Sequence, residues 1–303
     1  MVSSLAVSVK GGAFDGSVVA ASAAWWTHLN TEAFIRSATG RAVLATPAHP
    51  LCRQAEAFAA LTGVAPFRDV RHVTLYGPDC SDARGVAVVD VSYQATNLVR
   101  HFKCQPGYAS LMTNGVTVYH WRNPSGAGAV AACFPAPQRI LFASDESLLF
   151  AAVAVLRSKA PSWNAQTGTL PLSRLAPPGV FFQGATRGCP ESLANTLPGT
   201  LLRDVSVIAS AISETGGQAQ IDLQLSAASE SAAMQLEQLA NGLILAGAIS
   251  RGAGGGETAP PWNRLVAGTT VTRHGTTVKI NSACPPAEMA ELLSQGLDNL
   301  GQR

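Results

Sequence analysis

The chain has 303 residues, of which 47% are hydrophobic and 13% are charged, and its formal net charge is +2. This composition excludes a disordered chain, which needs few apolar residues and a high net charge. The small net charge gives no electrostatic reason to expect a nucleic acid or an anionic membrane as the partner. The best candidate for a membrane span, Gln238 to Ser250, is too short. A spanning helix needs about 20 mostly apolar residues, so we expect no transmembrane segment.

Residues 1–23 are interpreted as an N-terminal extension or the remnant of a leader. Lys10 is the first cation, Asp15 follows it, and the apolar stretch from Val18 to Trp26 begins after both. A signal peptide has its positive charges first, then an apolar run, and then a cleavage site of small residues. The order found here is different, so these residues do not form a clear signal peptide.

Residues 24–160 predict a first unit in which strands and helices are mixed. Alternating apolar residues indicate strands, and apolar residues spaced by three and four indicate helices. The strongest local signal is Asn114-Gly115, which is typical of a two-residue hairpin turn. In chain order, we expect a strand at 24–30, helices at 31–44 and 51–61, strands at 70–76 and 85–93, a helix at 96–103, strands at 108–112, 116–121, 130–134 and 139–143, and a helix at 144–159.

Residues 161–178 are rich in Pro, Ser, Thr and Gly, which predicts a linker. The pattern starts again at 179 and continues to 303 as a second unit. Its expected elements are a strand at 179–183, a helix at 190–197, strands at 205–211 and 218–226, a helix at 229–249, a glycine-rich loop at 252–256, strands at 269–272 and 276–281, and a helix at 286–300. The helix at 229–249 has an apolar stripe that contains Leu236, Leu239, Leu243 and Ala246.

The two units correspond to each other piece by piece. Val88–Val91 matches Gln220–Leu223, and Asn114–Val118 matches His274–Val278. Successive hairpins favour antiparallel pairing, and such a sheet can bury one face under helices. We therefore predict an α+β protein with two tandem copies of a mostly antiparallel sheet and helices packed on one face. Chance similarity between the units remains an alternative, because their identity is weak.

The six cysteines include no C-x-x-C pair, which excludes zinc ribbons and thioredoxin-like redox motifs. Cys80 lies in the turn between two predicted strands, and Cys104 ends the helix that follows the second of them. A helix that runs back along that strand would bring the two thiols together. The resulting disulfide would stabilise the fold by roughly 3 kcal/mol. Two free thiols are the alternative.

Motifs of catalysis and of cofactor binding are absent from the sequence. It contains no G-x-S-x-G, no G-x-x-x-x-G-K-[ST] and no H-E-x-x-H, so no cofactor and no metal is expected. The weak catalytic candidates are Asp90 and two strand histidines, His28 and His120, which stand beside Trp26 and Trp121. The alternative for the histidines is that they are ordinary, partly exposed side chains. The alternative for Asp90 is a structural role, because an aspartate recurs at the matching place in the second unit.

Short motifs with aromatic ends follow one another through the first unit. They are Trp25–Glu32, Ala57 with Leu61-Thr62-Gly63, Val73–Gly77, Gly107-Tyr108 with Asn114-Gly115, Tyr119-His120-Trp121 and Ser144-Asp145-Glu146. In this order they resemble a family of uncharacterised exported bacterial proteins, mainly over residues 24–160. The resemblance implies an exported or periplasmic α+β protein with two repeats. It carries over no active-site residue.

Two hypotheses of function remain. The first is a non-enzymatic envelope or periplasmic protein that acts by binding or assembly, with a protein partner or with itself. The duplicated sheets and the missing motifs favour it. The second is a hydrolase whose site is assembled from His28, His120 and Asp90. This hypothesis predicts that the three side chains lie within hydrogen-bond reach of one another in one cleft, as catalysis by a hydrolase requires.

Overall fold

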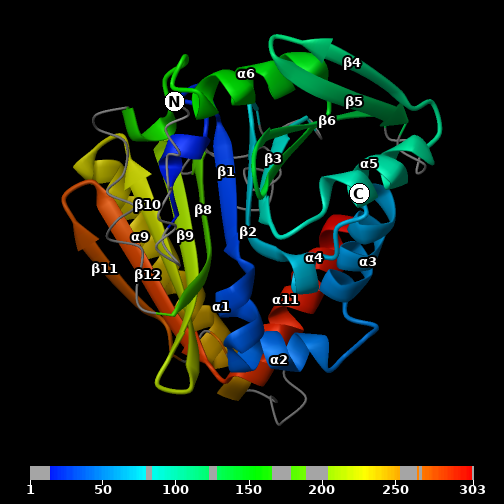
Figure 1. Ribbon diagram of the computed structural model, residues 1–303. Helices are drawn as coiled ribbons and strands as arrows, with labels where there is room; N and C mark the ends of the chain where they lie inside the picture. The colour runs from blue at the N-terminus through cyan, green and yellow to red at the C-terminus, as the bar shows by residue number, and fades with distance from the viewer. Residues whose placement is uncertain are drawn as a thin grey trace.

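The computed structural model describes residues 14–79, 84–122, 128–165, 179–188, 204–252, 265 and 268–301. Its described strands form one twelve-stranded antiparallel sheet (Figure 1). In chain order they are β1 (Trp25–Asn30), β2 (Val70–Gly77), β3 (Val86–Val91), β4 (Ala109–Thr113), β5 (Val116–Arg122), β6 (Ala129–Ala136), β7 (Arg139–Ala143), β8 (Val180–Arg187), β9 (Val205–Thr215), β10 (Gln218–Ala227), β11 (Thr270–His274) and β12 (Thr277–Cys284).

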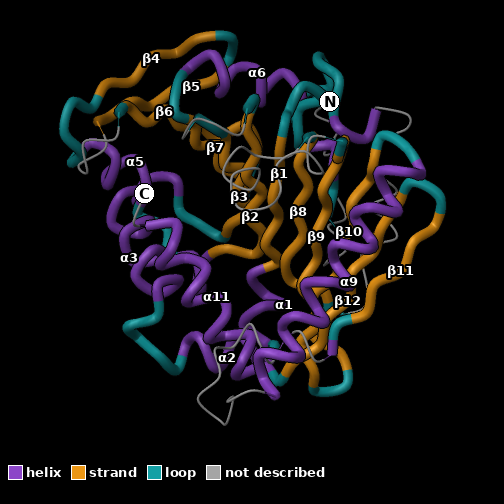
Figure 2. The backbone as a smooth tube through the Cα atoms, turned by 180° about the vertical axis from the view of Figure 1, so that it is seen from behind, coloured by secondary structure: helices purple, strands orange, loops and turns teal. Residues whose placement is uncertain are grey.

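Helices flank this sheet on both sides (Figure 2). They are α1 (Thr31–Arg36), α2 (Ala38–Leu44), α3 (Pro50–Thr62), α4 (Pro66–Asp69), α5 (Ala95–Lys103), α6 (Glu146–Leu156), α9 (Glu230–Gly252) and α11 (Pro286–Gly301), with short 3-10 helices η1 (Gly16–Val18) and η2 (Trp163–Ala165).

The strand order is β11-β12-β10-β9-β8-β1-β2-β3-β7-β6-β5-β4. The α+β class and the antiparallel pairing predicted from the sequence are confirmed. Strand β1 pairs with β2 on one side and with β8 on the other, so the two predicted units share one continuous sheet. The orders β1-β2-β3-β7-β6 and β8-β9-β10-β12-β11 agree position by position, while the tandem duplication itself stays a prediction. Strands β5 and β4 extend the sheet beyond this shared order on one side only.

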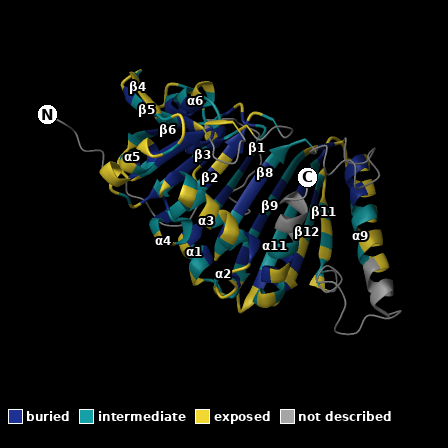
Figure 3. Cartoon of the chain, turned by 90° about the vertical axis from the view of Figure 1, so that its right-hand side faces the viewer, coloured by how far each residue is buried: buried dark blue, intermediate teal, exposed yellow. Residues whose placement is uncertain are grey.

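Different elements cover the two faces of the sheet, and the central strands are buried between them (Figure 3). Trp26 and Val88 lie in a cluster with Leu149 of α6 and with residues of η1 and η2, and we call this side the α6 face. The side chain of Val89 points the other way. It packs with Phe102 of α5 on the opposite face, which α1, α3, α9 and α11 also cover. Most of the helices thus share one face, and α6 adds a cover to the other.

Ser37 divides the helix expected at 31–44 into α1 and α2. Its backbone is extended, with φ −67° and ψ 157°, and its hydroxyl accepts a hydrogen bond from the Gly40 N–H at 2.8 Å. Glu214 of β9 also accepts hydrogen bonds from the N–H groups of Ala38 and Thr39, at 2.8 and 3.0 Å. These contacts satisfy the free N–H groups at the start of α2. The distant Glu214 is invisible to a local sequence pattern.

Part of the expected N-terminal extension belongs to the core. Phe14 stacks on Trp26 with ring centroids 3.8 Å apart, and Val18 and Val19 are buried on the α6 face. Ala20 forms a β-bridge with the residue at 162, at the start of the expected linker. The rest of that linker, 166–178, lies outside the described residues. So do residues 1–13, the helix expected at 190–197 and the glycine-rich loop from 253 onward.

Candidate functional site

The three catalytic candidates do not share one cleft. His28 lies on β1, Asp90 on β3 and His120 on β5, and four strands separate β1 from β5. Neighbouring strands are about 4.8 Å apart, which puts His28 and His120 roughly 24 Å from each other along the sheet. The convergence that the hydrolase hypothesis expects is therefore not found.

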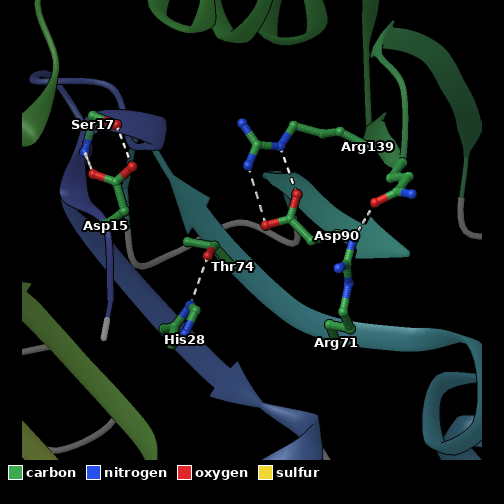
Figure 4. A network of polar contacts seen from close by, with 8 residues as sticks. Asp15, Ser17, His28, Arg71, Thr74, Asp90 and Arg139 are labelled. Carbon is green, nitrogen blue, oxygen red and sulfur yellow. Dashed lines mark hydrogen bonds and ion pairs between the residues drawn. The ribbon is translucent and has the colours of Figure 1, made fainter. Parts of the chain in front are cut away.

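His28 is buried on the α6 face, where its Nδ1 forms a hydrogen bond of 2.9 Å with the Thr74 hydroxyl (Figure 4). Its ring stacks on that of His72 with centroids 5.6 Å apart. Burial, helped by His72, lowers the pKa of His28 to about 4, although Asp90 and Asp15 raise it. Burial also lowers the pKa of His72. Both rings are therefore neutral near pH 7 and act as packed polar side chains.

Asp90 is held by an arginine of the neighbouring strand. Arg139 donates from Nε to Oδ1 at 2.6 Å and from Nη2 to Oδ2 at 3.2 Å, which makes the pair bidentate (Figure 4). Asp222 occupies the matching place in the second half and accepts a hydrogen bond from Asn281 of β12. Strands β7 and β12 hold the same position in the shared strand order. Asp90 is thus placed as a cross-strand structural partner.

His120 lines a separate pocket at the start of α6. Its Nε2 lies 2.8 Å from Oε1 of Glu146, and Ser144, Asp145 and three residues of β6 complete a pocket of about 350 Å³. The Ser144 hydroxyl accepts a hydrogen bond from the Gly85 N–H at 3.3 Å. No hydrogen bond joins it to His120 in the described structure. The pocket therefore lacks the paired nucleophile and base that a serine hydrolase needs.

The disulfide predicted between Cys80 and Cys104 is not formed. Cys104 is an exposed free thiol, and Cys80 lies outside the described residues. The prediction assumed that α5 runs back along β3. Instead, Phe102 of α5 stacks on Trp121 of β5 with centroids 4.6 Å apart. The chain then enters β4 at the edge of the sheet, which carries Cys104 away from the β2–β3 turn.

The buried thiols and imidazoles form no metal centre within the described ranges. Burial raises the pKa of Cys133 to about 12 and that of Cys284 to about 11, so both thiols stay protonated near neutral pH. Nε2 of His28 and Nδ1 of His72 are buried without a hydrogen-bond partner, but no third ligand joins them.

Strand β4 forms the open edge of the sheet next to β5 (Figure 1). Leu111 is 59% exposed and Met112 is 76% exposed, and their side chains point to opposite faces. The strand contains no charged residue and no proline. Natural edge strands use such residues to prevent pairing with another chain. β4 is therefore a template on which a further strand can form.

The turn Asn114-Gly115 sets the direction of the backbone groups of β4. Both residues have positive φ, 54° and 71°, as a type I′ turn requires. Thr113 pairs with the first residue of β5 beside this turn. Residues of an antiparallel strand alternate between bonding to their neighbour and pointing away from it. Counting from the turn, the N–H and C=O groups of Ser110 and Met112 point away from β5.

Cations stand at both ends of β4. At its start, Cγ of Arg122 lies 3.3 Å from the position that a Cβ of Gly107 would take, and Arg100 and Lys103 lie in the last turn of the adjoining α5. At the turn, Arg157 of the segment after α6 donates hydrogen bonds to the two turn carbonyl oxygens at 3.0 and 3.4 Å. All four side chains belong to exposed residues.

The sequence holds a signal for this surface in the spacing of its acidic residues. No Asp or Glu occurs between Asp90 and Asp145, a stretch that contains α5 and β4 to β7. The chain as a whole has 19 acidic residues, so this gap is a local excess of positive charge.

Comparisons with known proteins bear on the fold alone. No protein-family model matches the chain, and no curated protein matches it significantly. Solved structures of crystal forms III, I and IV of TP0453 are similar to it, with TM-scores of 0.56, 0.52 and 0.55 and sequence identities of 12%, 13% and 12%. Each match covers 94% of this chain and 100%, 98% and 98% of the TP0453 chains, respectively. Among the described helices, none is both long and apolar enough to cross a membrane.

Proposed function

We propose that this chain is a non-enzymatic binding or assembly protein of the bacterial envelope or periplasm, and that it binds a protein partner by strand addition to β4. The observation that carries the proposal is the uncharged edge strand with Leu111 and Met112 exposed. Main-chain hydrogen bonds to the outward groups of Ser110 and Met112 give affinity in this mode of binding. The two exposed apolar side chains supply contacts on either face of the added strand.

The position of β4 in the fold supports this role. Strands β4 and β5 lie outside the strand order that the two halves share. The hairpin is also held rigidly, because Phe102 stacks on Trp121 at its base and Arg157 binds the carbonyl oxygens of its turn. A rigid edge loses little conformational entropy when a partner binds, which favours affinity.

The resemblance to exported bacterial proteins supports the location in the envelope or periplasm. The hydrolase alternative has less support, because four strands lie between those that carry His28 and His120, and Asp90 is bound by Arg139. The Thr74 hydroxyl bonds to His28, but both side chains are buried, and within the described structure no carboxylate is hydrogen-bonded to the other ring nitrogen of His28 to orient it as a base.

Strand addition can be tested with a fluorescent peptide of about seven residues in which valine and threonine alternate. Its binding to the full chain is measured by fluorescence anisotropy. Ser110→Pro removes one outward N–H and leaves the bonds to β5 in place, since proline is tolerated where an edge N–H faces solvent. We expect at least about a tenfold loss of affinity for this variant. The matched control, Ser110→Ala, keeps the N–H and should keep the affinity.

A second arm leaves the protein unchanged. The same peptide, N-methylated at alternate residues, loses the N–H groups of one edge while keeping its side chains. We expect one of the two possible methylation patterns to abolish binding, because only one edge of the peptide faces β4. Equal binding of both methylated peptides and the parent peptide, or of Ser110→Pro and Ser110→Ala, would contradict the proposal.

A further inference from the structure

We infer that the strand received by β4 is acidic, with carboxylates at its two ends and apolar residues between them. This inference rests on the proposed function and adds the chemistry of the partner. It follows from the charges that surround the edge, from the distance between them, and from the cost of pairing β4 with a second copy of itself.

The charge around β4 is of one sign. Between Val91 and Ser144 the sequence has four cations and no carboxylate. Arg139 is neutralised by Asp90, which leaves Arg100, Lys103 and Arg122. None of these three is in an ion pair with a described carboxylate. Glu146 reaches this end of the sheet, but it contacts His120. A positive patch without internal compensation favours a negative partner.

The two groups of cations are separated by the length of the strand. Arg122 lies over Gly107, before β4, and Arg157 binds the turn at Asn114. Seven residues of extended chain span about 24 Å. An added strand of about eight residues therefore reaches from one cationic end to the other. Its terminal carboxylates would meet the cations, and its centre would meet Leu111 and Met112.

A second copy of the chain fits this edge less well. In an antiparallel pair of β4 strands, the turn end of one copy meets the starting end of the other. That arrangement brings Arg157 of one copy towards Arg122 and Lys103 of the other. Like charges placed against each other oppose association. The edge therefore suits a different protein with the opposite charge.

The test compares three fluorescent peptides that share a central valine–threonine–valine–threonine segment and differ in their ends. The ends are pairs of glutamate, glutamine or lysine. At about 50 mM salt we expect the glutamate peptide to bind at least about tenfold more tightly than the glutamine peptide, and the lysine peptide to bind most weakly. At about 500 mM salt the advantage of glutamate should fall to about threefold or less, because salt screens exposed charges.

A charge-matched pair of variants locates the effect. The triple variant Arg100→Gln, Lys103→Gln, Arg122→Gln should lose most of the preference for the glutamate peptide over the glutamine peptide, and Arg157 at the turn accounts for the part that stays. The control triple Arg36→Gln, Arg53→Gln, Arg68→Gln removes the same charge from exposed residues of α1, α3 and α4 and should keep the preference.

The outcomes separate this inference from the proposed function. Equal binding of the glutamate and glutamine peptides to the parent chain overturns the inference and leaves strand addition standing. No binding of any peptide overturns both. Tighter binding of a single-stranded oligonucleotide than of the glutamate peptide, lost in the triple variant at 100, 103 and 122, overturns the inference in favour of a nucleic-acid partner.

Discussion

His28 and His72 share the polar part of the α6 face, where burial keeps both rings neutral. Thr74 satisfies Nδ1 of His28, but its Nε2 has no partner. Protonation would therefore place a positive charge beside a second imidazole in a desolvated site. Asp90 and Asp15 favour that charge, yet Asp90 is already bound by Arg139, and the pKa of His28 stays at about 4. Folding therefore makes His28 harder to protonate than it is in the unfolded chain.

We predict that the chain loses stability as the pH falls from 6.5 towards 4. The folded pKa of His28 is about 4 and its ordinary value is 6.5, so the unfolded chain binds more protons in this interval. Stability is then complete above pH 6.5 and falls with pH until the folded pKa is reached. The shift corresponds to about 3 kcal/mol, taken as an order of magnitude. Urea unfolding at several pH values measures the slope.

His28→Gln removes the titrating ring and should flatten this slope between pH 4 and 6.5, with the lowered pKa of His72 as the remaining contribution. His274→Gln, at the exposed last residue of β11, is the control and should leave the slope unchanged. If His28→Gln and the parent chain show the same slope, His28 does not carry the dependence.

The sequence could place these residues on strands but could not bring them together. His28, Asp90 and His120 all lie on strands where alternation predicted them. The distance between them depends on which strands are neighbours, and that is decided by contacts between residues far apart in the chain. β7 inserts between β3 and β6, which separates His120 from the other two. No local pattern contains this information.

At the scale of elements, α9 shows the same limit. Its expected range, 229–249, agrees closely with Glu230–Gly252. An apolar stripe of this kind indicates the side of a helix that packs against the rest of the fold, and Leu236 is 3% exposed in the cluster on the face opposite α6. Leu243, two turns later, is 52% exposed, and Leu245 is 62% exposed. Periodicity predicts an apolar side of a helix, but the extent of the sheet beneath decides how much of that side is covered.

We predict different costs for substituting the buried Leu236 of α9 and the two exposed leucines further along this helix. Leu236→Ala leaves a cavity against β10 and β12 and should lower the free energy of unfolding by about 3 kcal/mol. The double variant Leu243→Gln, Leu245→Gln removes exposed apolar surface and should change the free energy by less than about 0.5 kcal/mol. Chemical denaturation of both variants beside the parent gives the comparison. A larger loss for the double variant than for Leu236→Ala would show that the outer turns of α9 are buried in solution.

The cysteine prediction failed at this scale for a related reason. Helix α5 was placed along β3 because it follows β3 in the sequence. The aromatic side chain of Phe102 instead packs against Trp121 and Tyr119 of β5 and Phe134 of β6. Burial of large aromatic side chains decides where this helix packs, and the position of the helix directly after β3 in the sequence does not. Knowledge of the partner of Phe102 would have been needed to place Cys104.

At the scale of the whole molecule, the two predicted units are joined where a boundary was expected. Trp25 to Leu29 of β1 pair with Phe182 to Thr186 of β8. On the α6 face, Trp26 belongs to the same cluster as Ala185 of β8 and Ala209 and Ala211 of β9. The alternating patterns predicted the strands of each half. The β1–β8 ladder joins the two halves by pairing residues that are more than 150 positions apart in the sequence. Such long-range pairing is not encoded in a local pattern.

We predict that the described sheet unfolds as one cooperative unit, so that a change in β1 is felt in β9 and β10. Trp26 is completely buried, and Trp26→Ala should cost about 4 kcal/mol. If both halves lose the same free energy of unfolding, amide hydrogen exchange should accelerate relative to the parent chain by similar factors in β9 and β10 and in β2 and β3. Trp25→Ala is the matched control, because its partly buried side chain contacts the β2–β3 end of the sheet through the Asp79 carbonyl oxygen. It should give a smaller acceleration in all four strands. Acceleration confined to β2 and β3 in Trp26→Ala would instead show that the halves are energetically separate units, despite their shared sheet.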